Sequence, residues 1–589
     1  MNSSSNYGDQ ICDLLVALKY THCFYVAGGN IMHLLNSASK KFTCIPVIHE
    51  VSAGIAAEYF SECNRDSNSR AFALVTAGPG LTNIITAMAG AFLESRELLV
   101  IGGQVKSSDL NPGGLRQNGI QEIDGIKLVE SVTTSRLRLD STIPLNDVQK
   151  FLDRPKSERK GPIFLEFCLD AQAHPSIQSS ESYEPEKETL LESDFSKFFD
   201  VFGTYKRPTL LIGGGVSRQF AKEHSSELKS LPMPIMTTWN ASDRIDSRNQ
   251  NYFGRPNTWG QRAANVILQQ SDLIIAIGTR LGLQQTGFNW SEFGPLANIV
   301  HVDIDSNELN RKNLNTVFKF KADADEFLRE FLRKSKFEQN AEWMAFAQKV
   351  KQLLPVSEAV NNNYSGYWNP YEFILNLSQL LVEGDVIIPS SSGGAETVTM
   401  QALQQLSQNT IITNKGLASM GYGLAGAIGA ALKTNKRVFH IEGDGGFAQN
   451  LQELGTVAKN HLPIKTFIFD NGGYASIRMT QKNYFGGDYL GCDSSTGLGL
   501  PSWNQIFAAY EIPIRELSPE PGFDESIIDL LNSDGPQAFL VPLHAEQTYF
   551  PKISSRVDAE GRMQSNPLHL MAPPLGEEVA KIVFPYLKI

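Results

Sequence analysis

"RVFHIEGDGGFAQNLQELGTVAKNHLPIKTFIFDNGGY", residues 437–474, decides the fold. Its pattern predicts a strand over 437–441, a helix over 448–459 and a second strand over 463–469. Strand, helix and strand in this order form one unit of a parallel sheet. Asp444 and Asn471 follow the two strands, so we expect both at the sheet edge where α/β proteins bind ligands.

Oxygen donors and glycines gather at this edge. Asp444 offers a carboxylate, Asn471 an amide oxygen and Gly473 a backbone carbonyl, and Mg²⁺ prefers such hard oxygens and shares them with phosphates. Gly445 and Gly446 let the backbone approach closely, and the next helix N-terminus favours an anion. The stretch therefore predicts Mg²⁺ with a diphosphate. The alternative is a glycine-rich turn without a ligand, which the second motif, 27 residues after Asp444, argues against.

Length and composition exclude several protein classes. The chain has 589 residues, 42% of them hydrophobic and 20% charged, as in globular proteins with several domains. A net charge of −11 gives no electrostatic reason to bind nucleic acid. No apolar run reaches the roughly 18 residues of a membrane span, and the start, "MNSSSNYGDQICDLL", does not resemble a signal peptide. Six scattered cysteines without a C-x-x-C pair favour a reducing, cytoplasmic location.

Apolar β runs alternate with helical patterns through most of the chain, which predicts an α/β protein with doubly wound parallel sheets. Two segments break this pattern and are interpreted as junctions: a polar stretch over 173–193 and a charged helix with a polar end over 330–368. We predict domains over 1–172, 195–330 and 365–548, followed by a C-terminal arm or lid over 549–589.

A carboxylate stands at an unusual place in "IPVIHEVSAG", residues 45–54. Glu50 follows a short β run and opens a helix rich in small residues, where an ionised group needs a partner or a function. Taken alone, it is best explained as a helix N-terminal carboxylate stabilised by the helix dipole. The alternative is a proton-handling group in a site.

Several motifs in one order resemble the thiamine-diphosphate enzymes, and among them the acetolactate synthases. Besides the GDG and DNGG motifs they are "HEVSAGIAAEYF" (49–60), "TAGPGLTNIITAMAGAFLESRELLVIGGQV" (76–105), "GIQEID" (119–124) and "NKGLASMGYGLAGAIGA" (414–430). The resemblance implies a pyrimidine-binding first domain, a central domain of the FAD or Rossmann type and a diphosphate-binding third domain. It also implies thiamine diphosphate and Mg²⁺ as cofactors, with Asp444, Asn471 and Gly473 as metal ligands.

The resemblance assigns roles to single residues. Glu50 matches the glutamate that bonds the pyrimidine ring and promotes loss of the cofactor's C2 proton. Gln121 matches an active-site glutamine, although it could also be an exposed loop amide. The Gly416 backbone would accept from the cofactor's amino group, and Met420 would hold the cofactor bent unless it is ordinary core. The expected cofactor contacts are Gly28, Pro79, Asn83, Gly393, Gly416, Met420, Gly445, Gly446, Ala475 and Ser476.

The central domain resembles the part of acetolactate synthase that holds FAD. "LLIGGGV" (210–216) and "IVHVDIDSNEL" (299–309) are among the matching stretches. Positions that would contact FAD are Gly214, Thr237, Gly278, Arg280, Asp303 and Asp323. Many relatives keep this domain without a flavin, and glycines also serve ordinary turns, so FAD stays open.

The chain departs from acetolactate synthase where the acceptor should bind. Gln284 takes the place of an arginine that holds the acceptor's carboxylate, and an amide cannot replace that charge. Thr134 and Ser135 stand where the family has lysine and histidine. Gly394 and Ala395 replace a glutamine and a histidine on the diphosphate side, and the C-terminal tail is longer. Cofactor binding is therefore expected to be kept and acceptor recognition to be changed.

The predicted function is decarboxylation of a 2-oxo acid, pyruvate in the simplest case, and transfer of the acyl unit to an aldehyde or ketone such as a keto-sugar. The alternatives are a simple decarboxylase, a C–C lyase or hydrolase acting on a diketone or acyloin, and a non-catalytic subunit. The resemblance implies a homodimer or homotetramer with active sites between subunits. The donor, the acceptor and the pathway do not follow from the sequence.

Overall fold

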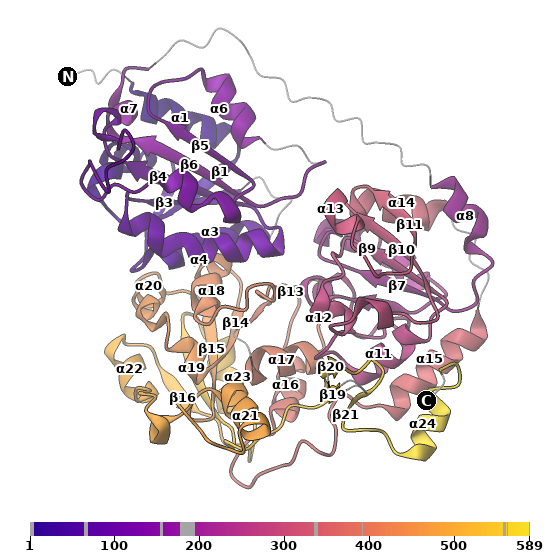
Figure 1. Cartoon of the computed structure of the whole chain (residues 1–589). Coiled ribbons are helices and arrows are strands. Elements are labelled where there is room, and N and C mark those ends of the chain that lie inside the picture. Colours follow the sequence, from indigo (N-terminus) through magenta and orange to yellow (C-terminus); the bar gives the residue numbers. More distant parts are fainter. Residues whose placement is uncertain are drawn as a thin grey trace.

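The computed structural model describes residues 5–63, 69–153, 157–176, 195–334, 340–390, 393–557, 561 and 563–587. Three parallel sheets follow one another along the chain, each flanked by helices, and a C-terminal arm crosses from the third to the second (Figure 1). The predicted fold class is confirmed. The exact domain boundaries stay predictions, and most of the junction over 173–193 lies outside the described residues.

The first sheet has the strand order β2-β1-β3-β4-β6-β5. Its strands are β1 (Tyr20–Tyr25), β2 (Thr43–Pro46), β3 (Arg70–Val75), β4 (Leu98–Gln104), β5 (Ser135–Leu139) and β6 (Pro162–Cys168). The helices around it are α1 (Tyr7–Ala17), α2 (Met32–Ala38), α3 (Glu50–Cys63), α4 (Pro79–Glu94), α5 (Gly125–Leu128), α6 (Leu145–Leu152) and α7 (Leu169–Ala173).

The second sheet has the order β11-β10-β9-β7-β8. Its strands are β7 (Pro208–Ile212), β8 (Ile235–Thr237), β9 (Leu273–Ile277), β10 (Asn298–Asp303) and β11 (Thr316–Lys321). Its helices are α8 (Ser196–Phe202), α9 (Arg218–Glu223), α10 (Ser225–Ser230), α11 (Arg262–Gln269), α12 (Leu283–Thr286), α13 (Ser306–Leu309) and α14 (Ala324–Lys334), and α15 (Ala341–Leu353) follows.

The third sheet has the order β13-β12-β14-β15-β17-β16. Its strands are β12 (Val386–Pro389), β13 (Thr410–Ile411), β14 (Val438–Gly443), β15 (Ile464–Asp470), β16 (Ile514–Glu516) and β17 (Gln537–Pro542). Its helices are α16 (Pro370–Ser378), α17 (Gly394–Ala402), α18 (Tyr422–Thr434), α19 (Asp444–Phe447), α20 (Leu454–Lys459), α21 (Ala475–Tyr484), α22 (Trp503–Ala509) and α23 (Glu525–Asn532).

The stretch that predicted the fold forms neighbouring strands β14 and β15, paired in parallel from Val438 with Ile464 to Gly443 with Phe469. The single helix predicted over 448–459 is wrong. A 3₁₀ turn over Leu451–Glu453 and the short helix α20 replace it. Asn450 interrupts the helix because its backbone is not helical and its side chain donates a hydrogen bond to the carbonyl of Gly421.

Small residues bring the first and third domains together. Helix α3 is buried along its whole length and packs against α18, which Figure 1 shows between the two domains. A Cβ added at Gly429 would lie 2.1 Å from the carbonyl oxygen of Ala56, and one at Gly426 would lie 2.7 Å from the ring of Tyr59. The small residues that follow Glu50 therefore allow two helix backbones to touch.

The C-terminal arm packs on the central domain. It contains β18 (Lys552–Ile553) paired with β21 (Met571–Ala572), β19 (Ser555–Val557) paired with β20 (Met563–Ser565), and α24 (Glu577–Val583). Leu568, Val583 and Phe584 belong to the same hydrophobic cluster as α11. Arg262 of α11 donates to the carbonyl of Met571, which anchors the arm further.

No helix in the described part of the chain combines the length and the apolar character that a membrane crossing needs. The six cysteines are free thiols. The cytoplasmic location inferred from their scattered positions stays a prediction.

Candidate active site

Asp444 lies at the end of β14 and begins α19, where the sequence placed it. Its side chain is 1% exposed, and its two oxygens accept the backbone N–H groups of Gly445 at 2.7 Å and Gly473 at 2.8 Å. Burial, with the neighbouring carboxylate of Asp470, raises the pKa of Asp444 to about 7. A divalent cation beside these carboxylates would favour the ionised form and remove that penalty.

Asn471 supplies an oxygen without a partner. Its Oδ1 atom is buried and accepts no hydrogen bond, which is costly unless a ligand binds there. Among the described residues, no group of three or more histidine, cysteine, aspartate or glutamate side chains could hold a metal ion. The predicted ligand set differs from such groups because it combines the Asp444 carboxylate with the Asn471 amide and the Gly473 carbonyl. The residues present fit Mg²⁺ bound with a diphosphate.

Two helix N-termini form the predicted diphosphate cradle. Gly393 precedes α17 with a φ of +114°, and a Cβ there would lie 2.9 Å from Oγ of Ser476, the second residue of α21. A Cβ at Gly445 would lie 2.4 Å from the ring of Tyr474. Helices α17 and α21 therefore begin close to one another, and the first N–H groups of a helix attract an anion.

Glu50 is the first residue of α3, and its side chain is 8% exposed. The Asn83 side chain of α4 donates a 2.9 Å hydrogen bond to its carboxylate. The N–H groups of Ile48 and His49, just before α3, donate instead to Glu453 of the third domain, each at 3.1 Å. Glu453 thus accepts the N–H groups just before the helix, and the Glu50 carboxylate accepts from Asn83 instead.

The predicted Gln121 lies in an exposed loop, with a positive φ of 60°. Its backbone oxygen sits where a Cβ of Gly78 would be, so the loop is packed against the start of α4 at Pro79. Glu122 fixes this loop by accepting the N–H groups of Asn118 at 3.0 Å and Gly119 at 2.9 Å, besides that of Asn111. The structure therefore brings Gln121 beside Pro79.

The remaining predicted cofactor contacts lie at junctions between elements. A Cβ at Gly28 would lie 2.4 Å from Cβ of Thr76. Gly416 donates its N–H to Glu94 at the end of α4, so it joins the first and third domains. Met420 is half-buried, and its sulfur accepts from Gln449 at 3.6 Å.

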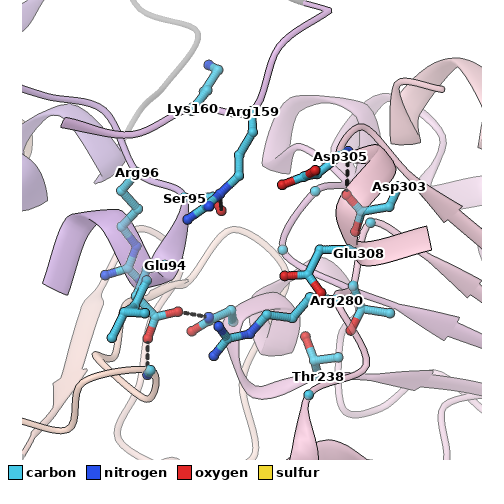
Figure 2. A pocket seen from close by; sticks show the side chains of 18 of the residues that line it. Glu94, Ser95, Arg96, Arg159, Lys160, Thr238, Arg280, Asp303, Asp305 and Glu308 are labelled. Atoms are coloured by element: carbon cyan, nitrogen blue, oxygen red, sulfur yellow. Dashed lines mark hydrogen bonds between the residues drawn. The ribbon is translucent and has the colours of Figure 1, made fainter. Parts of the chain in front are cut away.

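A cavity of about 630 Å³ lies where the three domains meet. Five of the six positions expected to contact FAD line it: Gly214, Gly278, Arg280, Asp303 and Asp323. Figure 2 shows Arg159 and Lys160 of the first domain on one side and Asp303, Asp305 and Glu308 of the central domain on the other. Burial raises the pKa of Asp303 to about 6, so a ligand hydroxyl or cation there would be favourable.

Thr237 is the exception among these six positions. It is fully buried in β8, and its hydroxyl is bonded to that of Tyr252 at 3.0 Å, so it does not line the cavity. The next residue, Thr238, does. Strand alternation explains the error, because one step along β8 turns a side chain to the other face. Gln284, at the start of α12, lines the same cavity with its side chain exposed.

Three neighbours of the site were not predicted from the sequence. Asp470 faces Asp444, Glu453 serves the start of α3, and Tyr549 of the arm packs against Gly394. Asp470 stands in the DNGG motif and could have been found there. Glu453 and Tyr549 contact parts of the chain that are distant in sequence, and neither residue stands in a recognisable motif. The sequence therefore carries no signal for either contact.

Comparisons with known proteins agree with this geometry. Three family models match: the thiamine pyrophosphate enzyme N-terminal TPP binding domain over residues 5–128, the central domain over 196–331 and the C-terminal TPP binding domain over 391–540. Each match contains most of one parallel sheet, and the three occur in the family's order.

Curated relatives cover nearly the whole chain. The acetolactate synthase isozyme 1 large subunit of Escherichia coli is 26% identical over 90% of this chain and 92% of its own length. A probable acetolactate synthase large subunit of Methanococcus aeolicus is 26% identical over 83% of each chain. The mitochondrial acetolactate synthase catalytic subunit of Saccharomyces cerevisiae is 25% identical over 90% of this chain and 80% of its own. With three matching family models along its length, this chain belongs to the thiamine pyrophosphate enzymes, close to the acetolactate synthases.

Proposed function

We propose that this protein decarboxylates a 2-oxo acid, with pyruvate as the first donor to test, and transfers the acyl unit to an aldehyde or ketone. The observation that carries the proposal is the pairing of two preserved half-sites in one family framework. One is the buried Glu50 with its hydrogen-bonded partner Asn83, and the other is Asp444 with the unpartnered oxygen of Asn471. Bound thiamine diphosphate would supply a carbon nucleophile that adds to a carbonyl and stabilises the charge left when CO₂ departs.

The chain's own residues divide the work. Asp444, Asn471 and the Gly473 carbonyl would hold the metal, and the N-termini of α17 and α21 would hold the diphosphate. Glu50 would exchange a proton with the pyrimidine ring, and Asn83, which donates to its carboxylate, would orient it. A non-catalytic subunit is disfavoured because each of these groups is present.

The acceptor follows from Gln284. This side chain lines the cavity where the resemblance places a carboxylate-binding arginine, and it carries no charge. A guanidinium–carboxylate pair is worth more than an amide–carboxylate hydrogen bond, so a keto acid would lose affinity there. We therefore propose a neutral carbonyl acceptor, such as a keto-sugar.

We further propose that the active form is a homodimer or a larger homo-oligomer. Large apolar side chains are exposed in the loop that holds Gln121 and in the segment after α21, at Ile120 (85%), Phe485 (66%) and Leu490 (78%). Exposed apolar side chains that gather into one patch often mark a protein–protein interface. A second copy would bury them and complete the site between subunits. Analytical ultracentrifugation would measure the oligomeric state.

FAD is a separate proposal for the cavity between the three domains. Its volume of about 630 Å³ falls within the range of cofactor pockets, and five of the expected contacts line it. A visible spectrum of the purified protein tests this directly, because a bound flavin is yellow. Thr238 replaces Thr237 in the set of residues to mutate.

The function is tested by supplying pyruvate, thiamine diphosphate and Mg²⁺, and measuring CO₂ release and products by mass spectrometry with and without carbonyl acceptors. The proposal expects cofactor-dependent CO₂ release and a ligated product when a suitable acceptor is present. An aldehyde as the product under every acceptor tried would favour the simple decarboxylase. Cleavage of an acyloin or diketone without CO₂ release would favour the lyase or hydrolase.

A further inference from the structure

Gly421 carries the bend between the loop that ends in Met420 and helix α18. Its φ is +74°, in the left-handed region that favours glycine. Its N–H donates to Oε1 of Glu442 at 3.3 Å, and its carbonyl accepts from the side chain of Asn450 at 2.6 Å. The N–H belongs to the peptide group that joins Met420 to Gly421, so Glu442 fixes the backbone of Met420 directly.

Glu442 is held in turn by a histidine of the same strand. It lies in β14, two residues before Asp444, and its Oε2 atom is 2.9 Å from Nε2 of His440. Both side chains are fully buried. A Cβ at Gly423, in the first turn of α18, would lie 2.4 Å from Nε2 of His440 and 2.8 Å from Oε2 of Glu442. The pair therefore packs directly against the start of this helix.

Core packing alone does not explain this pair. Buried polar side chains cost free energy unless they are hydrogen-bonded, and an apolar pair of the same shape can stabilise a core equally well. The hydroxyl of Thr466 in β15 is 3.5 Å from the other ring nitrogen of His440, so polar neighbours on both sides hold the imidazole in one orientation. The imidazole in turn leaves Oε1 of Glu442 directed at the N–H of Gly421.

Met420 needs a fixed backbone if it is to support a ligand. Its side chain is half-buried, and Gln449 donates to its sulfur at 3.6 Å. A methionine side chain has three rotatable bonds and adapts readily to its surroundings. A backbone that is hydrogen-bonded on both sides of Gly421 limits the space that this side chain can reach.

We propose that His440 and Glu442 are positioning residues: His440 orients the carboxylate of Glu442, which accepts the N–H of Gly421 and thereby directs Met420 toward the bound cofactor. The inference rests on the proposed function and on the role expected for Met420. The pair acts on the shape of bound thiamine diphosphate, whereas the strength of binding depends on Asp444 and its neighbours. A displacement of about 1 Å in a site can slow a reaction by about 100-fold.

The test uses the full-length protein with thiamine diphosphate and Mg²⁺. It measures how fast the C2 proton of the bound cofactor exchanges with deuterium, and calorimetry measures cofactor affinity. Glu442→Met has a side chain of similar length that cannot accept the N–H of Gly421. We expect exchange to slow by about 10- to 100-fold while cofactor affinity stays close to that of the wild type. Glu442→Gln keeps an oxygen that can accept this N–H and should restore most of the rate.

Two further variants separate positioning from a general loss of stability. Lys465→Met is the matched control, because it removes a buried polar group near the start of β15 that donates to the carbonyls of Ser533 and Gly535. Its exchange rate should equal that of the wild type. Asn450→Ala removes the bond to the carbonyl of Gly421 and should slow exchange as Glu442→Met does, so it serves as the test if Glu442→Met does not fold.

A double-mutant cycle shows whether the pair acts through Met420. In a Met420→Ala background, Glu442→Met should slow exchange no further, because no side chain is left to direct. Wild-type exchange in Glu442→Met or Asn450→Ala, or an additive loss in the Met420→Ala background, would overturn the inference and leave the proposed function standing. Equal slowing in Lys465→Met would also overturn it. If the wild type bound the cofactor without accelerating exchange, the proposed function and this inference would both fall.

Discussion

The candidate metal site around Asp444 (the metal end of the third domain) and the cavity between the three domains are built in opposite ways. Around Asp444 the backbone provides the hydrogen bonds to the carboxylate, Gly445 and Gly473 have no room for a Cβ, and Asp444 itself is buried. The cavity is lined by charged side chains from separate elements, such as Arg159 and Arg280, and much of its lining faces solvent (Figure 2).

The difference teaches which properties of the protein can change independently. In a site formed by backbone groups and closely packed glycines, a substitution at one position disturbs the whole site. Its chemistry therefore cannot change independently of the fold. A cavity lined by exposed side chains can exchange one of them at small cost to stability. Cofactor use is therefore expected to be fixed in this chain, and acceptor choice to depend on single residues such as Gln284.

The largest effect is expected at the metal end. Asp444→Asn removes the charge of the one carboxylate in the predicted ligand set, so Mg²⁺-dependent binding of thiamine diphosphate should weaken by at least about 100-fold, the upper end of what outer neighbours cost. Isothermal titration calorimetry measures this binding. Asp488→Asn, on the exposed surface of the same domain, is the control and should bind normally. If Asp444→Asn bound the cofactor as tightly as the wild type, Asp444 would not hold the metal, and the contrast between the two regions would fail.

Glu50→Gln should separate catalysis from binding. The amide can still accept from Asn83 but cannot exchange a proton, so the rate of CO₂ release should fall about 10²- to 10⁴-fold, while calorimetry finds the cofactor bound as in the wild type. Glu130→Gln, an exposed glutamate of the same domain, should keep full activity. If Glu50→Gln released CO₂ at the wild-type rate, Glu50 would be only a helix N-terminal carboxylate.

The cavity should respond to a single charge. Gln284→Arg restores a guanidinium, so use of a keto acid as acceptor, measured as kcat/KM, should rise about 10- to 100-fold, the value of a charge-assisted hydrogen bond. Gln284→Met, of similar length and without charge, should show no such gain. If the arginine variant also showed none, acceptor choice would have to lie elsewhere in the cavity.

The last effect concerns the stability of the arm and not catalysis. Burial lowers the pKa of His569 to about 4 from its ordinary value of 6.5. The neutral ring therefore contributes fully to the free energy of unfolding above pH about 6.5. This contribution is lost as the pH falls toward 4, by up to about 3 kcal/mol. Urea unfolding at pH 7 and pH 5 should show a larger loss in the wild type than in His569→Gln. His33→Gln, as control, should lose as much as the wild type.

The sequence predicted the sheets and the place of Asp444 and Asn471 at the ends of two strands, because both depend on local patterns. Strands β14 and β15, Asp444 and Asn471 belong to one stretch, where alternation, glycines and strand ends are visible without the fold. The helix over 448–459 was wrong because the bond from Asn450 to Gly421 is a tertiary contact. The contact of Glu453 with the residues just before α3 and the contact of Tyr549 with Gly394 were missed for the same reason, because both are tertiary contacts.

The predicted FAD contacts show which residue positions a family resemblance can place in the cavity and which it cannot. Gly214, Gly278 and Asp303 line the cavity, but Thr237 faces the core, because a strand position displaced by one residue changes the face. The glycines of turns, such as Gly214 and Gly278, line the cavity as the resemblance implies, whereas Thr237, a lone side chain in a short strand, does not.

The central claim is that Asp444 and Asn471 hold the cofactor and that Glu50 makes it reactive. The direct measurement is the rate at which the C2 proton of enzyme-bound thiamine diphosphate exchanges with deuterium, followed by quenching and NMR. We expect fast exchange in the wild type and exchange slowed about 10²- to 10⁴-fold in Glu50→Gln at equal cofactor occupancy. The same exchange rate in both proteins would contradict the claim.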